Sequence, residues 1–159
     1  MKNIDWSNLP FGYMRTDYNV RCYYRNGEWG ALELCSEETI NLHMAATCLH
    51  YGQEGFEGLK AYRGKDGKIR IFRPEANAER LQSTCRGILM PELPTELFVN
   101  AVKKVVKANE RFIPPYESGA ALYIRPLLIG TSAQVGVHPA SEYLFVIFVT
   151  PVGPYFKGG

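Results

Sequence analysis

The stretch that decides the fold runs from Leu49 to Leu81 and reads LHYGQEGFEGLKAYRGKDGKIRIFRPEANAERL. Two β-prone runs, Leu59–Arg63 and Lys68–Arg73, flank the sequence Gly64-Lys65-Asp66-Gly67, which is typical of a β-hairpin turn. Pro74 follows where a helix can begin, because the fixed φ of proline suits the first helical position. The stretch therefore predicts a glycine-rich loop, a hairpin and a helix in succession, together forming one wall of a small-molecule pocket.

The residues before this stretch predict a second hairpin. Tyr18–Tyr24 and Trp29–Leu34 are β-prone, and Asn26-Gly27 between them is a strong hairpin signal. The first ten residues are polar and predict an irregular arm. Residues 36–40 predict a turn or a short helical cap, and the apolar segment Asn41–Leu49 fits either a strand or a helix.

Two amphipathic helices are expected after the central hairpin. The first spans Pro74 to about Leu89, and its apolar stripe consists of Ala78, Leu81, Cys85 and Ile88. The second spans about Thr95 to Arg111 with Thr95 as its N-cap. Its apolar stripe consists of Leu97, Ala101, Val105, Ala108 and Phe112.

Two further strands complete the pattern, Ala120–Ile129 and Tyr143–Val149, with a loop at 131–139 between them. On the first strand Tyr123 and Arg125 share one face because they are two residues apart. The second strand is apolar on both faces, which predicts a central, covered position. Strands outnumber the helices that could cross between them, so we expect an α+β fold with a mostly antiparallel sheet and two main helices.

Composition narrows the class of protein. The 159 residues suit a single domain, and 18 basic against 16 acidic residues give a net charge of +2, too balanced for nucleic-acid binding. We expect no membrane span, because no apolar run reaches about 18 residues. The four cysteines form no CxxC pair and no signal peptide is visible, which favours reduced thiols in a cytoplasmic protein. The ending Lys157-Gly158-Gly159 is expected to be a domain boundary or a truncation.

The motifs that usually carry catalysis are missing. His43, His50 and His138 have no metal-site spacing, so we expect no metal, and no GxSxG sequence indicates a hydrolase. What remains is anion binding, since Arg80 and Arg125 lie on or beside apolar faces and a guanidinium grips phosphate or carboxylate in a bidentate way. A structural ion pair or a side chain lying along apolar surface would also explain either arginine.

Four motifs in order carry a resemblance. YGQEGFEGL at 51–59, FRPEANAERL at 72–81, LYIRPLLIG at 122–130 and PVGPYF at 151–156 resemble the branched-chain amino acid aminotransferases, pyridoxal-phosphate enzymes of fold type IV. The resemblance runs from Phe11 to the end of the chain and corresponds to the smaller, N-terminal domain of that family, so the expected domain is 1–159. It implies transfer of an amino group between leucine, isoleucine or valine and 2-oxoglutarate, with glutamate as the other amino acid.

The resemblance also implies roles for single residues. Arg80 matches the arginine that binds the cofactor phosphate. Phe11, Tyr51, Phe56 and Tyr123 match the wall of the substrate side-chain pocket, and Tyr51 also lies near the substrate carboxylate in the family. Without the resemblance, these aromatic residues could equally be ordinary core residues.

Three more residues take roles from the resemblance. Arg125 matches the residue associated with the distal carboxylate of glutamate or 2-oxoglutarate. Val135 and Val137 match residues that the family inserts into the active site of the partner subunit, which implies a homodimer. An arginine at the rim of an apolar pocket would let one site accept both leucine and glutamate.

The main departure from the family is the missing Schiff-base lysine, which lies in the C-terminal domain of these enzymes. Lys60 and Lys157 do not lie in its sequence context, so no catalytic residue is assigned and the chain alone is expected to be inactive. Two alternatives stay open: a stand-alone, non-catalytic module that binds an anionic ligand, and a relative such as a D-amino acid aminotransferase or an aminodeoxychorismate lyase. The motifs LYIRPLLIG and PVGPYF favour the branched-chain enzymes over the latter.

Overall fold

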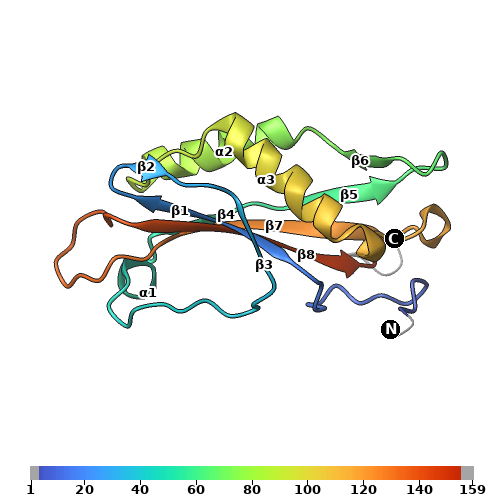
Figure 1. Cartoon of the computed structure of the whole chain (residues 1–159), viewed down its shortest axis with the longest axis horizontal. Coiled ribbons are helices and arrows are strands. Elements are labelled where there is room, and N and C mark those ends of the chain that lie inside the picture. Colours follow the sequence, from blue (N-terminus) through green and yellow to red (C-terminus); the bar gives the residue numbers. More distant parts are fainter. Residues whose placement is uncertain (1–3, 155–159) are drawn as a thin grey trace.

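The computed structural model describes residues 4–154, and within them eight strands form one sheet in which every strand pairing is antiparallel (Figure 1). The main path across the sheet runs through β2 (Glu28–Trp29), β1 (Asn19–Arg25), β8 (Tyr143–Val152), β7 (Ala121–Gly130), β5 (Leu59–Arg63) and β6 (Ile69–Ile71). Two short strands lie off this path: β3 (Glu33–Cys35) pairs with β1, and β4 (Glu54–Phe56) pairs with β7. The α+β class with an antiparallel sheet is confirmed.

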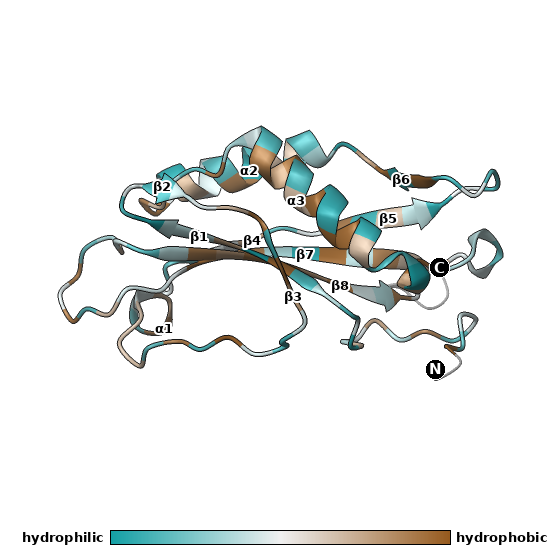
Figure 2. Cartoon of the chain, viewed as in Figure 1, coloured by the Kyte–Doolittle hydropathy of each residue, from teal (hydrophilic) through white to brown (hydrophobic). Residues whose placement is uncertain are grey.

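Helices cover one face of this sheet. α2 (Pro74–Gly87) and α3 (Thr95–Ala108) lie together on that face, which we call the helix face, and short 3-10 turns follow at Glu110–Phe112 and Tyr116–Ser118 (Figure 1). The opposite face, called the open face, carries the one-turn helix α1 (Thr47–Tyr51) and long loops (Figure 1). Hydrophobic residues concentrate along β7 and β8 and on parts of α2 and α3, while the loops are mixed (Figure 2).

The pairing of β7 with β8 is the most extensive strand pairing of the sheet. Ten residue pairs join the two strands, from Ala121 opposite Val152 to Gly130 opposite Tyr143. β8 also pairs with β1 on its other side, so it is central and its residues are buried except for Phe148, as its sequence predicts. On β7, Leu122 and Ile124 are fully buried, whereas Tyr123 and Arg125 are only partly buried, which agrees with the alternation expected from a period of two.

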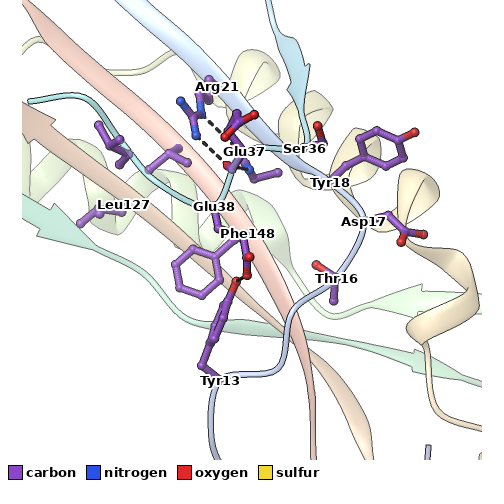
Figure 3. Close-up of a pocket in the computed structure, with 13 residues that line it drawn as sticks. Tyr13, Thr16, Asp17, Tyr18, Arg21, Ser36, Glu37, Glu38, Leu127 and Phe148 are labelled. Atoms are coloured by element: carbon purple, nitrogen blue, oxygen red, sulfur yellow. Dashed lines mark hydrogen bonds between the residues drawn. The ribbon is translucent and has the colours of Figure 1, made fainter. Parts of the chain in front are cut away.

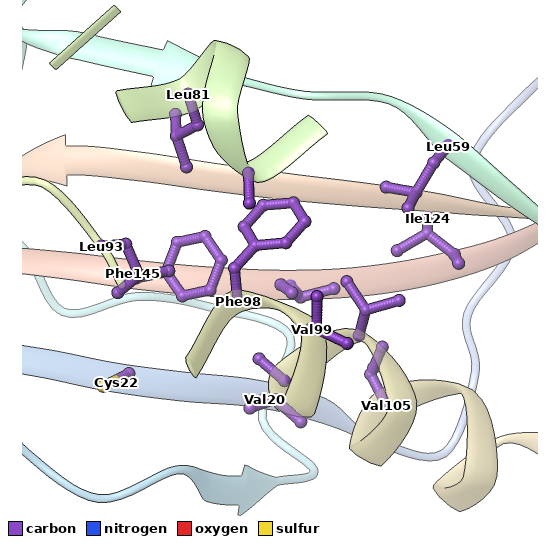
Figure 4. Close-up of a cluster of buried hydrophobic side chains, with 14 of the residues drawn as sticks. Val20, Cys22, Leu59, Leu81, Leu93, Phe98, Val99, Val105, Ile124 and Phe145 are labelled. Atoms are coloured by element: carbon purple, nitrogen blue, oxygen red, sulfur yellow. The ribbon is translucent and has the colours of Figure 1, made fainter. Parts of the chain in front are cut away.

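The core lies between the sheet and the two main helices. Phe98 on α3 packs against Phe145 on β8 with ring centroids 5.9 Å apart (Figure 4). Around this pair lie buried aliphatic residues from both helices, from the connection between them and from the strands, among them Leu81, Leu93, Val99, Val105, Val20 and Ile124. This layer holds the strands in register and so fixes which side chains the open face presents.

Several details of the predicted helices were wrong. Ile88 follows the end of α2 and is 38% exposed, so the buried stripe of this helix stops at Cys85. On α3 the buried residues include Phe98, Val102 and Val106, while the predicted Leu97 and Ala108 are only partly buried. The buried face is turned toward Phe98, because that large ring fills the space above Phe145.

The ends of the elements also differ from prediction. Thr95 is the first residue of α3 and does not cap it; its hydroxyl instead accepts a hydrogen bond of 3.1 Å from Gln82 Nε2 and so links α3 to α2. The ambiguous segment 41–49 holds only the start of α1, and residues 36–40 form no helix. The run 29–34 is split, since the Gly30 amide bonds the Tyr23 carbonyl at 2.8 Å before β3 begins.

Asn109, just after α3, ties the segment that leads into β1 to the helix layer. Its side chain is fully buried, and its Oδ1 accepts hydrogen bonds from the amides of Asp17 and Tyr18, each 3.0 Å long. Its Nδ2 donates to the carbonyls of Tyr18 at 2.9 Å and Val105 at 2.8 Å. The side-chain amide therefore satisfies four backbone groups at once.

We expect Asn109→Ala to lower the free energy of unfolding by about 2–4 kcal/mol, because it leaves several buried backbone groups without partners. Urea denaturation measures this change. Asn100→Ala on the exposed side of the same helix is the control and should change the free energy by no more than about 0.5 kcal/mol. Equal effects of the two substitutions would contradict the assigned role of Asn109.

Candidate functional site

Arg125 is the best-defined cation of the open face. Its guanidinium carbon lies 4.5 Å from the ring centroid of Phe56 and 5.2 Å from that of Tyr123. Its Nε donates a hydrogen bond of 3.1 Å to the hydroxyl of Tyr123. Two rings and one hydroxyl thus hold the guanidinium, and such cation–π contacts stabilise a charge that is partly removed from water.

A cavity of about 250 Å³ lies beside this arginine, and we call it the arginine cavity. It is lined by Phe11, Gly12, Tyr13, Tyr123, Arg125, Phe148, Thr150 and Val152. The Phe11 ring meets the Tyr123 ring edge-on at 5.5 Å. An aromatic wall with one cation suits a ligand that has an apolar body and can carry a negative charge at one end.

The tripeptide Phe56-Glu57-Gly58 connects the arginine cavity to Arg80. Phe56 stacks on Arg125, while the buried carboxylate of Glu57 accepts hydrogen bonds from Nε of Arg80 at 2.8 Å and from its Nη2 at 2.6 Å. Gly58 leaves room for Tyr123, because a Cβ at this position would lie 2.6 Å from the tyrosine hydroxyl. Three consecutive residues therefore touch both arginines and the tyrosine between them.

Arg80 is exposed and available for an anion. Its side chain is 68% exposed, and among the described residues only Glu57 accepts hydrogen bonds from its guanidinium. The hydrogen bond and then the charge of Glu57 raise the pKa of Arg80 above its already high value, so the group stays cationic at every physiological pH. The terminal edge of the guanidinium remains for a phosphate or carboxylate, which it can bind in a bidentate way.

Tyr51 and the two valines lie elsewhere. The Tyr51 hydroxyl donates a hydrogen bond to the carbonyl of Val135, and Tyr51 and Val137 line a second cavity of about 270 Å³, here called the loop cavity. The other residues that line it are Gly52, Gln53, Ile88, Leu89, His138 and Pro139. The structure therefore brings Phe11, Phe56, Tyr123 and Arg125 together, but places Tyr51 outside the arginine cavity.

The valines of the 131–139 loop stand in solvent in this chain. Val135 is 87% exposed and Val137 is 85% exposed, although both are apolar. Exposed apolar side chains at a loop tip are a common feature of contact surfaces. Their expected insertion into a partner subunit stays a prediction.

A third cavity, of about 160 Å³, lies between the N-terminal arm, residues 36–40 and the open face of β7 and β8, and Figure 3 shows it. The Tyr13 hydroxyl donates to Glu38, which also pairs with Arg15 at 3.2 Å. Burial of the hydroxyl and the hydrogen bond to Glu38 raise the pKa of Tyr13 to about 12. Here Arg21 donates to the carbonyl of Glu37 (Figure 3). The polar groups of this cavity largely bind one another. These bonds hold residues 36–40 against the segment before β1 and against β1 itself, so the cavity is a structural feature and not a ligand site.

Other site chemistries find little support within residues 4–154. This part of the chain contains no cluster of three or more histidine, cysteine, aspartate or glutamate side chains that could hold a metal ion. Burial raises the pKa of both Cys22 and Cys85 to about 11, which leaves these thiols protonated and poorly nucleophilic. Among the same residues, none of the helices has both the length and the apolar character needed to cross a membrane.

Sequence reasoning missed three polar residues of the site. Glu57 and Asn77 form the support of Arg80, and Asn77 Nδ2 donates to Glu57 at 2.9 Å. Lys60 pairs with Tyr123 across β5 and β7, so it projects to the open face as a further cation near Arg125. For Glu57 a signal was available in the sequence. It lies between Phe56 and Gly58 in a stretch expected to be buried, and a buried acid requires a cation.

Comparison with known proteins agrees with this geometry. No family model matches the chain. It is 54% identical over all 159 residues to a branched-chain-amino-acid aminotransferase of Haemophilus influenzae, and 52% identical over 159 residues to that of Helicobacter pylori. Over its whole length the chain is similar to enzymes named as branched-chain-amino-acid aminotransferases. It spans 46% and 47% of the length of these two relatives, so it corresponds to less than half of such a protein.

Solved structures of branched-chain aminotransferases share the fold. The Escherichia coli enzyme superimposes with a TM-score of 0.69 over 89% of this chain and 42% of its own, at 24% identity. The enzyme of Thermoproteus uzoniensis, solved with norvaline, matches with a TM-score of 0.66 over 87% of this chain and 43% of its own, at 26% identity. The resemblance seen in the sequence motifs is confirmed, except that Tyr155 and Phe156 of the last motif lie outside the described residues.

Gly58 gives a direct test of the close packing between the tripeptide and Tyr123. We expect Gly58→Ala to lower the free energy of unfolding by about 1–3 kcal/mol, because the new methyl group would displace the Tyr123 ring. Chemical denaturation measures the loss.

Gly12→Ala is the matched control, since a Cβ there would meet no atom within 4 Å although Gly12 lines the same cavity. A stability loss in the control as large as that of Gly58→Ala would show that the contact with Tyr123 is not the cause.

Proposed function

We propose that this chain forms the substrate-facing part of a branched-chain aminotransferase site that uses pyridoxal phosphate. The observation that carries the proposal is the pair of arginines joined by Phe56-Glu57-Gly58: Arg80 with an open guanidinium edge, and Arg125 at the wall of an aromatic cavity. The curated relatives named as branched-chain aminotransferases support the same assignment.

The residues present fit a phosphorylated cofactor. Arg80 is cationic, exposed and held along one edge only, which leaves hydrogen-bond donors for a phosphate group. Pyridoxal phosphate, when bound, supplies the electron sink that transamination requires. A further solved branched-chain aminotransferase that shares the fold is described with pyridoxamine 5'-phosphate, which supports a cofactor of this class. In the proposal, Arg80 binds the phosphate, and the Schiff-base lysine comes from the part of the enzyme beyond the matched region.

The arginine cavity fits the two kinds of substrate. Phe11, Tyr123 and Phe148 offer apolar surface to the side chain of leucine, isoleucine or valine, whose burial contributes roughly 1.5–3 kcal/mol. Arg125 offers a charge to the distal carboxylate of glutamate or 2-oxoglutarate. Because Phe56 and Tyr123 hold this guanidinium in place, it can serve the charged substrate without moving into the space of the apolar one.

The enzyme is further proposed to be a cytoplasmic homodimer. The exposure of Val135 and Val137 supports the dimer, because a partner subunit would remove both side chains from water. Tyr51 contacts the same loop, so it would contribute to the substrate pocket from the edge where the loop enters the site.

The cofactor grip can be tested in the full-length protein that carries this chain. We expect Arg80→Ala to weaken pyridoxal phosphate binding by about 1–3 kcal/mol, the scale of a lost charged hydrogen bond. Titration of the apo protein measures the dissociation constant. Arg86→Ala is the control on the same helix, because Arg86 pairs with Glu92 at 3.0 Å away from Glu57. Unchanged affinity in Arg80→Ala would remove Arg80 from the site.

The role of Arg125 predicts a split between substrates. Arg125→Ala should lower kcat/KM for glutamate more than for leucine, since only glutamate carries the distal carboxylate. Steady-state kinetics with the two amino acids measure the ratio. Tyr123→Phe, which removes the hydroxyl that accepts from Arg125 Nε, should shift the ratio in the same direction by a smaller amount. Equal losses for both amino acids in Arg125→Ala would count against the assignment.

A further inference from the structure

Glu57 is a buried carboxylate for which the proposed function gives no role. Only 3% of it is exposed, and it accepts hydrogen bonds from Arg80 Nε at 2.8 Å, Arg80 Nη2 at 2.6 Å and Asn77 Nδ2 at 2.9 Å. Its own backbone amide donates to the carbonyl of Pro126 on β7 at 2.9 Å. The sheet therefore sets the position of this carboxylate independently of Arg80.

The two partners of this ion pair are very unequal in exposure. Arg80 is 68% exposed, whereas Glu57 is 3% exposed. An exposed arginine without a fixed partner samples many rotamers, and each anion that it binds must select one. Because the guanidinium is planar and rigid, holding its Nε and Nη2 edge at Glu57 also fixes the direction of its terminal edge, formed by Nη1 and the second hydrogen of Nη2.

We propose that Glu57 is a positioning residue for the phosphate of the cofactor: it holds Arg80 in one orientation, so that the terminal edge of the guanidinium is presented to the phosphate. Asn77 supports this arrangement, since it donates to Glu57 Oε2 and to the carbonyl of Gly58 at 3.3 Å. The inference rests on the proposed function, in which Arg80 binds that phosphate.

The negative charge of Glu57 opposes its positioning effect. The balance between the two decides whether removal of the charge weakens or tightens cofactor binding. A carboxylate repels a phosphate, so repulsion alone predicts that its removal tightens cofactor binding. The carboxylate, however, lies behind the guanidinium and next to an exposed side chain, where distance and solvent weaken the repulsion. Orientation of the arginine is not screened by salt. We therefore expect loss of the charge to weaken binding.

The experiment uses Glu57→Gln in the full-length protein, with pyridoxal phosphate as the probe. The dissociation constant should rise about tenfold, the effect of losing one charged hydrogen bond. The rise should persist at about 1 M salt, where screening removes most charge effects between exposed groups. Asp17→Asn is the matched control, because Asp17 also binds an arginine, Arg111, through Nε and Nη2, and it should leave the dissociation constant unchanged.

A second readout follows the bound phosphate itself by ³¹P NMR. In the unchanged protein the phosphate should stay a dianion across a pH titration, because the oriented arginine binds that form. In Glu57→Gln the ³¹P shift should move with pH near the second pKa of a phosphate monoester, about 6. This signal reports on the phosphate and does not depend on turnover.

Failure of the positioning role and failure of the proposed function give different results. If Arg80→Met weakens binding while Glu57→Gln leaves it unchanged or tightens it, the positioning role is wrong and the function stands. If Arg80→Met itself has no effect, both are wrong. Should Glu57→Gln fail to fold by circular dichroism, Asn77→Ala takes its place, with an expected weakening of roughly two- to fivefold; no weakening there overturns the positioning role.

Discussion

A buried carboxylate must be paired, and this requirement at Glu57 shapes the site. A buried charge without a partner is strongly unfavourable, so the chain must bring a cation to that position. Arg80 on α2 meets the need, with hydrogen bonds of 2.8 and 2.6 Å. The pairing links α2 to the residue that follows β4, and it leaves most of the Arg80 side chain exposed.

The division of the sheet into two faces explains how one small domain can be both stable and able to bind. On the helix face, buried side chains from β1, β7 and β8 pack against α2 and α3 (Figure 4). On the open face, the alternate residues of β7 carry the aromatic and cationic groups. A single strand thus contributes Leu122 and Ile124 to stability and Tyr123 and Arg125 to the cavity, so neither set can shift without the other.

Much of the fold followed from local sequence. The hairpin of β5 and β6, the start of α2 at Pro74 and the alternation along β7 depend on turn chemistry and periodicity, which act over a few residues. Which side of α3 is buried did not follow from local sequence. Leu97 and Phe98 are both apolar, and the choice between them depends on where Phe145 lies in the folded chain. Similarly, the contact between Tyr51 and Val135 joins residues 84 positions apart, and no local pattern encodes it. The site arginines could be recognised as anion-binding candidates, and Tyr123 could be placed beside Arg125 by the period of the strand. The pairing of Arg80 with Glu57 could not be assigned, since Glu57 lies outside α2 and meets Arg80 only in the folded chain.

The order of strands has a consequence for how the protein is made. β8 follows all the other strands of this sheet in sequence, yet it separates β1 from β7, and both pair with it along most of their length. While a ribosome is still synthesising the chain, the first strand has no neighbour in the middle of the sheet, and the apolar edge of β7 stays uncovered. Until β8 has emerged, these uncovered surfaces can aggregate or bind chaperones. Mild destabilisation of the domain would therefore first reduce the yield of folded protein at this stage of synthesis.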